Sequence, residues 1–150
     1  DFRPSVAEWE RLLEPGTRLI YCNYPNNPTG AVVDGEFWRE AAELAMRREA
    51  VLVNDAAYLE VTLDGSRPES LLRTADPAAD RVIELHSLSK MFNMTGWRIA
   101  FAVGHAAVVG ALARVKESMD SGVFTPVQQV AARALGEDFA ETFPECHFAE

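Results

Sequence analysis

The sequence predicts an α/β domain built on a largely parallel β-sheet, and three observations support that fold class. Short apolar runs that are typical of strands alternate along the chain with segments of helical periodicity. One of these runs, residues 50–54, is continuously apolar up to its last residue, as expected of a strand buried on both faces. Polar clusters directly follow the strands, as they do where ligands bind at the carboxyl ends of parallel strands.

The first half of the chain supplies two strands and the helix between them. Residues 18–22 form the first predicted strand, which ends in the turn-rich segment 23–30. Asp34 is the expected N-cap of a helix that runs to about Arg48 and has an apolar face at residues 37, 41, 44 and 45. Residues 50–54 then form the second strand.

The second half supplies two strands on either side of a lysine and two helices after them. Residues 82–85 and 99–103 are apolar runs of strand length, and Lys90 lies between them. Apolar residues at 108, 112, 115 and 119 repeat at helical spacing. Thr125 is the expected N-cap of a last helix, with Pro126 at its first position.

The composition fits one soluble domain and excludes several classes of partner. The net charge of −9 over 150 residues argues against nucleic acid and against anionic membrane surfaces. No apolar run approaches the length of a membrane span, and the first residues lack signal-peptide character, so a cytoplasmic protein is expected. Cys22 and Cys146 lie far apart without CxxC spacing, so neither a metal site nor a disulfide is expected.

The segment 86–104 combines an amine with groups that bind phosphate. Lys90 can condense with an aldehyde once its amine loses its proton. The hydroxyls of Ser87 and Ser89 and the planar guanidinium of Arg98 are suitable donors to a phosphate. A solvated turn is the ordinary explanation for such a run, but two apolar strands flank this one. Pyridoxal 5'-phosphate (PLP) carries both an aldehyde and a phosphate, which makes it the expected cofactor.

Three polar residues after the first two strands are candidates for holding the ring of that cofactor. Asp55 would pair with a protonated pyridine nitrogen, or it caps a short helix. Tyr58 would bind the phenolic oxygen of the ring, or it is a core tyrosine with a satisfied hydroxyl. Asn27 would be a second donor to the same oxygen, or simply a turn residue. His86 and His105 have no partner visible in the sequence, and no role is expected for them.

The ordered motifs YPNNPTG, NDAAY and SLSKMFNMTGWR resemble the class I/II aminotransferases, PLP-dependent enzymes of fold type I. The resemblance implies that residues 1–136 are the central part of the three-layer large domain, whereas residues 137–150 do not resemble the family continuation. Carried over by position, it implies that Lys90 is the Schiff-base lysine and general base, that Asp55 holds the pyridine nitrogen, that Tyr58 and Asn27 hold the phenolic oxygen, and that Ser87, Ser89 and Arg98 bind the phosphate.

The resemblance further implies transfer of an amino group between an amino acid and a 2-oxo acid. The segments DAAY, HSLSK, NMTGWRIA and KESMDSGVF resemble LL-diaminopimelate aminotransferases and neighbouring alanine- or aromatic-type enzymes. A homodimer is implied, with residues 121–122 near the partner subunit. Family members are much longer and carry a substrate-binding arginine for which Arg114 and Arg133 are poor substitutes, so this chain alone is expected to be inactive. The alternatives are a carbon–sulfur β-lyase on the same scaffold, a regulator that binds the cofactor without turnover, and a non-functional remnant.

Overall fold

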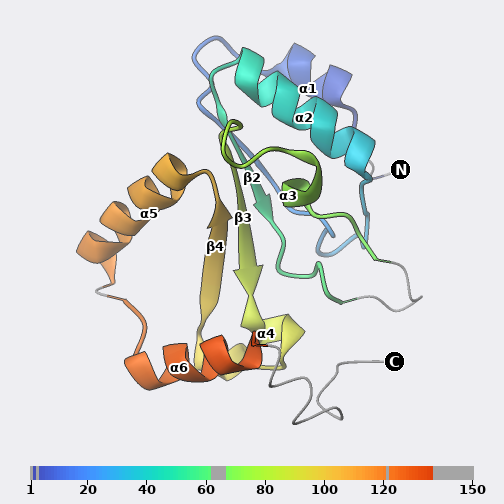
Figure 1. The fold of residues 1–150 in the computed structure, drawn as a ribbon. Coiled ribbons are helices and arrows are strands. Elements are labelled where there is room, and N and C mark those ends of the chain that lie inside the picture. Colours follow the sequence, from blue (N-terminus) through green and yellow to red (C-terminus); the bar gives the residue numbers. More distant parts are fainter. Residues whose placement is uncertain (1, 3, 62–66, 121, 137–150) are drawn as a thin grey trace.

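The computed structural model describes residues 2, 4–61, 67–120 and 122–136, and its helices and strands alternate as expected (Figure 1). In chain order the elements are α1 (Val6–Leu12), β1 (Leu19–Cys22), α2 (Gly35–Arg47), β2 (Val51–Asp55), α3 (Leu71–Thr74), β3 (Val82–Ser87), α4 (Leu88–Met91), the 3₁₀-helix η1 (Thr95–Trp97), β4 (Ala100–Gly104), α5 (Ala106–Met119) and α6 (Thr125–Ala134). The predicted tail at 137–150, which includes Cys146, lies outside the described residues.

The strands form one sheet in the order β1-β2-β3-β4. β1, β2 and β3 are parallel, and β4 is antiparallel to β3, which confirms the largely parallel sheet. A parallel connection must carry the chain back to the other end of the sheet, usually through a crossover helix. Between β3 and β4 the chain passes only through the short α4 and η1, so it returns along β3 in the opposite direction.

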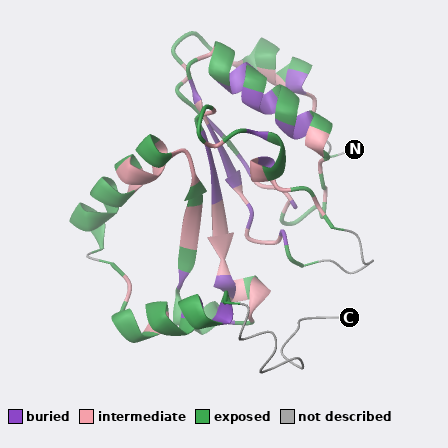
Figure 2. Ribbon diagram, viewed as in Figure 1, coloured by how far each residue is buried: buried purple, intermediate pink, exposed green. Residues whose placement is uncertain are grey.

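The core lies between α2 and one face of the sheet. Asp34 caps α2 as predicted, because its Oδ1 accepts a hydrogen bond from the Phe37 amide at 2.9 Å. The apolar stripe of α2 packs against alternate residues of the strands. The main members of this cluster are Trp38, Ala41, Leu44 and Ala45 from the helix and Ile20, Leu52 and Val82 from the sheet. Figure 2 shows these buried positions gathered where α2 meets the strands.

The opposite face of the sheet is less completely covered. Along β1, Ile20 and Cys22 are buried, whereas Leu19 and Tyr21 are 56% and 57% exposed. α5 packs against β3 and β4, and it lies beside β4 in Figure 1. α6 buries Ala131 in a second cluster with Leu88, Met94 and Ile99, close to α4.

Some element boundaries differ from the predicted ones. β2 and β3 continue to Asp55 and Ser87, so these residues end their strands instead of following them. Phe124, not Thr125, is the N-cap of α6, because the carbonyl of Phe124 already accepts from the Val127 amide at 2.9 Å. Pro126 is therefore the second residue of α6 and not, as predicted, the first, although it still lies in the first turn. None of the helices in the described ranges is long and apolar enough to span a bilayer.

Candidate functional site

Lys90 lies in α4, a single helical turn that begins where β3 ends. Ser87 is the N-cap of α4, and its Oγ accepts a hydrogen bond from the Ser89 amide at 3.2 Å. This turn brings the exposed Lys90 side chain over the ring of Tyr58, with Nζ 5.7 Å from the ring centre. That distance is within the range of a cation–π interaction.

Tyr58 in turn contacts Asn27, so three separate segments meet at this end of the sheet. Asn27 Nδ2 donates a hydrogen bond to Tyr58 Oη at 3.0 Å. Tyr58 is half-buried and its hydroxyl meets an exposed asparagine, so it is not an ordinary core tyrosine. The structure therefore brings together Lys90, Tyr58 and Asn27, which the sequence places at the carboxyl ends of three strands.

Asp55, the last residue of β2, has hydrogen bonds to both carboxylate oxygens. Oδ2 accepts from Tyr21 Oη at 3.1 Å, and Oδ1 accepts from the Ala57 amide at 3.3 Å. Residues 56–61 form turns without a helix, so Asp55 does not cap a helix as the alternative reading suggested. Burial, and secondly the charge of Asp55, raise the pKa of Tyr21, which keeps its hydroxyl a donor at neutral pH.

Asn23, for which no role was predicted, joins the two loops that carry these groups. Its Nδ2 donates to the main-chain carbonyl of Asp55 at 2.7 Å, and its Oδ1 accepts from the Asn27 amide at 2.9 Å. Asparagines are common in turns, and the turn-rich segment 23–30 contains three of them. Its composition does not distinguish Asn23 from Asn26 and Asn27. The only signal was its position directly after a strand that neighbours β2.

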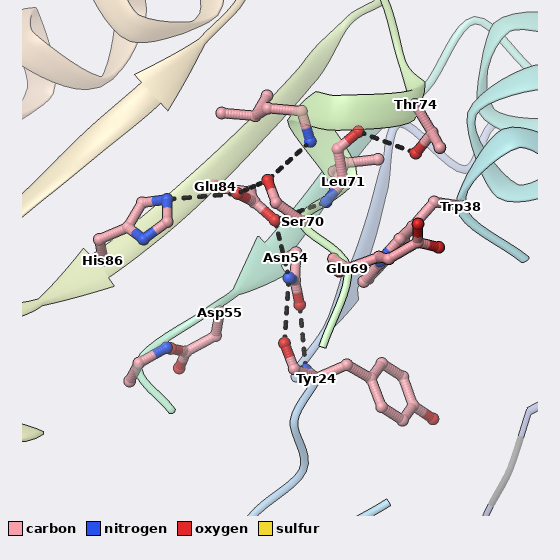
Figure 3. A network of polar contacts seen from close by, with 12 residues as sticks. Tyr24, Trp38, Asn54, Asp55, Glu69, Ser70, Leu71, Thr74, Glu84 and His86 are labelled. Atoms are coloured by element: carbon pink, nitrogen blue, oxygen red, sulfur yellow. Dashed lines mark hydrogen bonds and ion pairs between the residues drawn. The ribbon is translucent and has the colours of Figure 1, made fainter. Parts of the chain in front are cut away.

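A buried polar network supports the same loops from the other face of the sheet (Figure 3). The side chain of Asn54 pairs with the backbone of Tyr24, accepting from its amide at 3.0 Å and donating to its carbonyl at 3.1 Å. Asn54 Nδ2 also donates to Glu84 Oε1 at 3.1 Å. β2 and β3 thus hold the loop after β1 through side chains, beyond the point where the ladder of β1 ends.

Glu84 is fully buried, and each of its carboxylate oxygens accepts hydrogen bonds. Besides the contact with Asn54, it accepts from the Leu71 amide at 2.8 Å, from Ser70 Oγ at 2.7 Å and from His86 Nε2 at 3.2 Å. Burial alone would raise the pKa of Glu84, but these hydrogen bonds outweigh it and the pKa is lowered. The carboxylate is therefore charged at neutral pH.

Both histidines, for which the sequence shows no partner, have one in the structure. His86 contacts Glu84 because residues two apart on a strand share a face, and its ring stacks on Phe101 with 4.9 Å between the centres. His105 Nδ1 accepts from the Ala107 amide at 3.2 Å and caps α5.

The three predicted phosphate-binding residues lie on adjacent segments at the end of β3. Ser87 pairs with Ala100 across the β3–β4 ladder, so Arg98 lies just beyond that pair. Arg98 is exposed and left-handed, with φ 53°, a conformation that costs an L-residue about 1 kcal/mol and recurs at ligand sites. Its Nη1 donates to the Thr95 carbonyl at 2.8 Å, and within the described ranges no hydrogen bond joins it to Ser87 or Ser89.

The donor set fits a phosphorylated aromatic aldehyde with a ring nitrogen. Lys90 offers an exposed amine, and Asp55 offers a carboxylate whose oxygens each keep one lone pair. Ser87, Ser89 and Arg98 add hydroxyl and guanidinium donors for a phosphate.

Cys22 is a buried thiol. Cys22 Sγ donates to the Val53 carbonyl at 3.2 Å, and burial, with Glu84 second, raises the pKa of the thiol to about 12. Within the part of the chain that the structure describes, no three His, Cys, Asp or Glu side chains are grouped so that they could hold a metal ion.

Comparison with known proteins identifies the family of the chain. The model of the family "Aminotransferase class I and II" matches residues 1–145. The chain is 49% identical over 135 residues to the LL-diaminopimelate aminotransferase of Moorella thermoacetica, covering 89% of this chain and 34% of the relative. It is 46% identical over 129 residues to that of Natranaerobius thermophilus, covering 85% and 33%. The chain therefore spans about a third of the length of these curated relatives.

Solved structures agree with the sequence matches. N-succinyldiaminopimelate aminotransferase from Mycobacterium tuberculosis superposes with a TM-score of 0.81 at 31% identity, over 91% of this chain and 35% of that one. Aspartate aminotransferase from Thermus thermophilus with maleate gives 0.81 at 33% identity, over 95% and 36%. The family match runs past Gly136 to residue 145, and the boundary at residue 136 stays a prediction. The fold, the motifs and these matches together show that the chain belongs to the class I and II aminotransferases, a family of PLP-dependent enzymes.

Proposed function

We propose that the protein carrying this chain uses PLP to transfer an amino group between an amino acid and a 2-oxo acid. The observation that carries this proposal is the meeting of Lys90, Tyr58 and Asn27 at the carboxyl ends of the parallel strands in a member of this family. Ligands of open α/β sheets bind at that edge.

Lys90 is the proposed catalytic residue. When bound, PLP supplies the electron sink that makes the α-proton of an amino acid acidic. Lys90 would attach the cofactor through its amine and, once released by the substrate, take the proton from the α-carbon and return it. Its exposed side chain over the Tyr58 ring leaves the amine accessible for both tasks.

The ring of the cofactor would be held by Asp55 on one side and by Tyr58 and Asn27 on the other. Asp55 is the proposed partner of the pyridine nitrogen. Because Asn27 Nδ2 donates to Tyr58 Oη, the hydroxyl proton of Tyr58 is not used in that contact and can be donated to the phenolic oxygen.

The phosphate would be held by Ser87, Ser89 and Arg98. Ser87 Oγ accepts from the Ser89 amide, so its own proton remains available to an oxygen of the phosphate. Arg98 uses one of its N–H groups on the Thr95 carbonyl and keeps the others for the anion.

LL-diaminopimelate or a related amino acid is the proposed amino donor. Relatives named LL-diaminopimelate aminotransferase, at 39–49% identity, support this choice. A homodimer and a cytoplasmic location complete the proposal, the first from the family resemblance and the second from the composition.

The first test is the absorption spectrum of the full-length protein with PLP. The wild type should develop a visible band of bound cofactor, and Lys90→Ala should lose it. Lys116→Ala is the matched control, because Lys116 is an exposed lysine on α5 that forms an ion pair with Asp120. A wild type without a band, or a Lys90→Ala variant with an unchanged band, would contradict the proposal.

The second test concerns the reaction. Amino transfer from LL-diaminopimelate should be followed with a panel of 2-oxo acids, and release of a thiol from cystathionine should be measured in parallel. We expect a new amino acid from one of the 2-oxo acids and no thiol. Thiol release without amino transfer would point to a carbon–sulfur β-lyase instead.

A further inference from the structure

Tyr21 contacts Asp55 because of the register between β1 and β2. Tyr21 pairs with Val53 in the parallel ladder, and Asp55 lies two residues further along β2 on the same face. The Tyr21 ring lies on the face of β1 that points away from the α2 core. Its hydroxyl reaches Asp55 Oδ2 at 3.1 Å.

This hydrogen bond completes the fixation of the Asp55 carboxylate. The Ala57 amide holds Oδ1 at 3.3 Å, and Asn23 Nδ2 holds the Asp55 main-chain carbonyl at 2.7 Å. With Tyr21 on Oδ2, the backbone and both oxygens of Asp55 are tied to three different groups. Rotation of the carboxylate would break at least one of these contacts, while each oxygen still has a lone pair for a ligand.

We infer that Tyr21 is a positioning residue, whose hydroxyl holds the Asp55 carboxylate in the orientation that meets the pyridine nitrogen of the cofactor. The inference rests on the proposed function and adds to it a residue outside the motifs that identify the family. A phenylalanine would fill the same place on β1 but would leave Oδ2 without this donor. Small errors in the placement of such a group weaken its interaction with the ligand.

The test is the dissociation constant of PLP for full-length Tyr21→Phe, measured by the visible band of the bound cofactor. We expect binding about three- to tenfold weaker than in the wild type, since the carboxylate is no longer held in place before the cofactor binds and must be ordered on binding. Tyr24→Phe is the matched control. The Tyr24 ring packs against Phe37 and Trp38. The affinity of Tyr24→Phe for PLP should therefore stay within about twofold of the wild type. An unchanged affinity in Tyr21→Phe would overturn the inference.

A double-mutant cycle shows whether Tyr21 acts through Asp55. In an Asp55→Ala background, adding Tyr21→Phe should leave the affinity unchanged, because the acceptor is already absent. The same loss in both backgrounds would mean that Tyr21 acts elsewhere, and it would overturn the inference. Asp55→Asn serves if Asp55→Ala folds poorly. Its amide oxygen is a weaker, uncharged acceptor, so the effect of Tyr21→Phe should shrink but not disappear.

Two further readouts separate this inference from the proposed function. At saturating PLP, the visible circular dichroism of the bound cofactor should change in Tyr21→Phe and not in Tyr24→Phe, because it reports how the ring is held. Without cofactor, the pKa of Tyr21 should fall in Asp55→Ala, and an unchanged pKa would overturn the contact itself. A wild type that never binds PLP would overturn both the proposed function and the role of Tyr21. A wild type that binds PLP, with a Tyr21→Phe variant of the same affinity and circular dichroism, would overturn only the role of Tyr21.

Discussion

Glu84 places a charge among the apolar residues Val82, Ile83 and Leu85 of β3, and the surrounding residues keep it charged. A carboxylate in a dry environment is destabilising unless donors replace its water. Glu84 receives hydrogen bonds from β2, from the start of α3 and from His86 on its own strand. No buried side-chain oxygen or nitrogen in the described ranges lacks a partner.

Replacing this carboxylate should destabilise the protein and reduce its sensitivity to acid. We expect Glu84→Gln to lower the free energy of unfolding by about 1–3 kcal/mol at neutral pH, because one oxygen can no longer accept. The folded pKa of Glu84 is lowered, so its contribution is complete above the unfolded pKa of about 4.3 and is lost as the pH falls through the folded pKa. Urea unfolding from pH 7 to pH 3 measures both effects.

The exposed Glu43 provides the comparison. Glu43→Gln removes a surface ion pair with Arg39 and should change the free energy of unfolding by less than about 1 kcal/mol. Two outcomes would contradict the role given to the buried network. One is an equal loss of unfolding free energy in the two variants, and the other is an unfolding free energy of Glu84→Gln that falls as steeply toward pH 3 as that of the wild type.

The residues that carry the family motifs could be predicted from the sequence, and the residues that support them could not. Lys90, Asp55 and Tyr58 lie in motifs whose resemblance assigns them a role. Asn23 and Tyr21 contact Asp55 only through the pairing of β1 with β2, which single-sequence patterns do not determine. For Glu84 the sequence did contain an indication, because it is the one charged residue in the run 82–85 and lies two positions before His86.

Among the elements, β4 depends on a glycine where it meets β3. Gly104 has φ 156°, and a Cβ built there would collide with the Val82 carbonyl oxygen and lie 2.7 Å from Ile83 Cα. Both atoms belong to the backbone of β3, so a flexible side chain cannot move aside. The close approach lets β4 end its ladder against β3 directly before α5 begins.

Gly104→Ala should therefore lower the free energy of unfolding by at least about 2 kcal/mol, because strain and backbone displacement add. Gly110→Ala is the control inside α5, where the nearest neighbour of a new Cβ is Arg114 Nη1 at 3.7 Å. That variant should be stabilised by about 0.5–1 kcal/mol, since alanine is the better helix former. Thermal or urea unfolding measures the stability of both variants. A Gly104→Ala variant as stable as the wild type would contradict this prediction and show that β3 and β4 can move apart.

The longer elements were predictable, and the shortest were not. The helix capped by Asp34 and the helix over residues 106–119 each give enough turns for their periodicity to be seen. α3 and α4 are single turns, too short for any period, and they form where Ser70 and Ser87 cap them. The start of α6 was misplaced by one residue because Thr125 is the better capping residue by type, whereas the backbone begins the helix at the carbonyl of Phe124.

On the scale of the whole molecule, the sheet has two edges, β1 and β4, that pair with no further strand among the described residues. Edge strands with apolar side chains are templates for pairing between chains. β1 combines such an edge with the exposed side chains of Leu19 and Tyr21. The 150-residue chain on its own is therefore expected to self-associate.

Placing a charge on this edge should reduce the association. We expect Leu19→Lys to shift the 150-residue chain toward monomer in light scattering at a fixed concentration. Leu12→Lys, at a leucine on α1 that is even more exposed (77% against 56%), should not. A chain that is monomeric without any substitution, or two lysine variants with the same effect, would exclude the edge of β1 as the site of contact.

The hydrogen bonds that hold the loop after β1 in place have a consequence for the entropy of ligand binding. Asn54 holds both polar groups of the Tyr24 backbone, and Asn23 ties the Asn27 amide to the end of β2. The loop is thus ordered by the protein itself before any ligand arrives. Conformational freedom that is already lost on folding is not lost again on association, so more of the contact energy would appear as affinity.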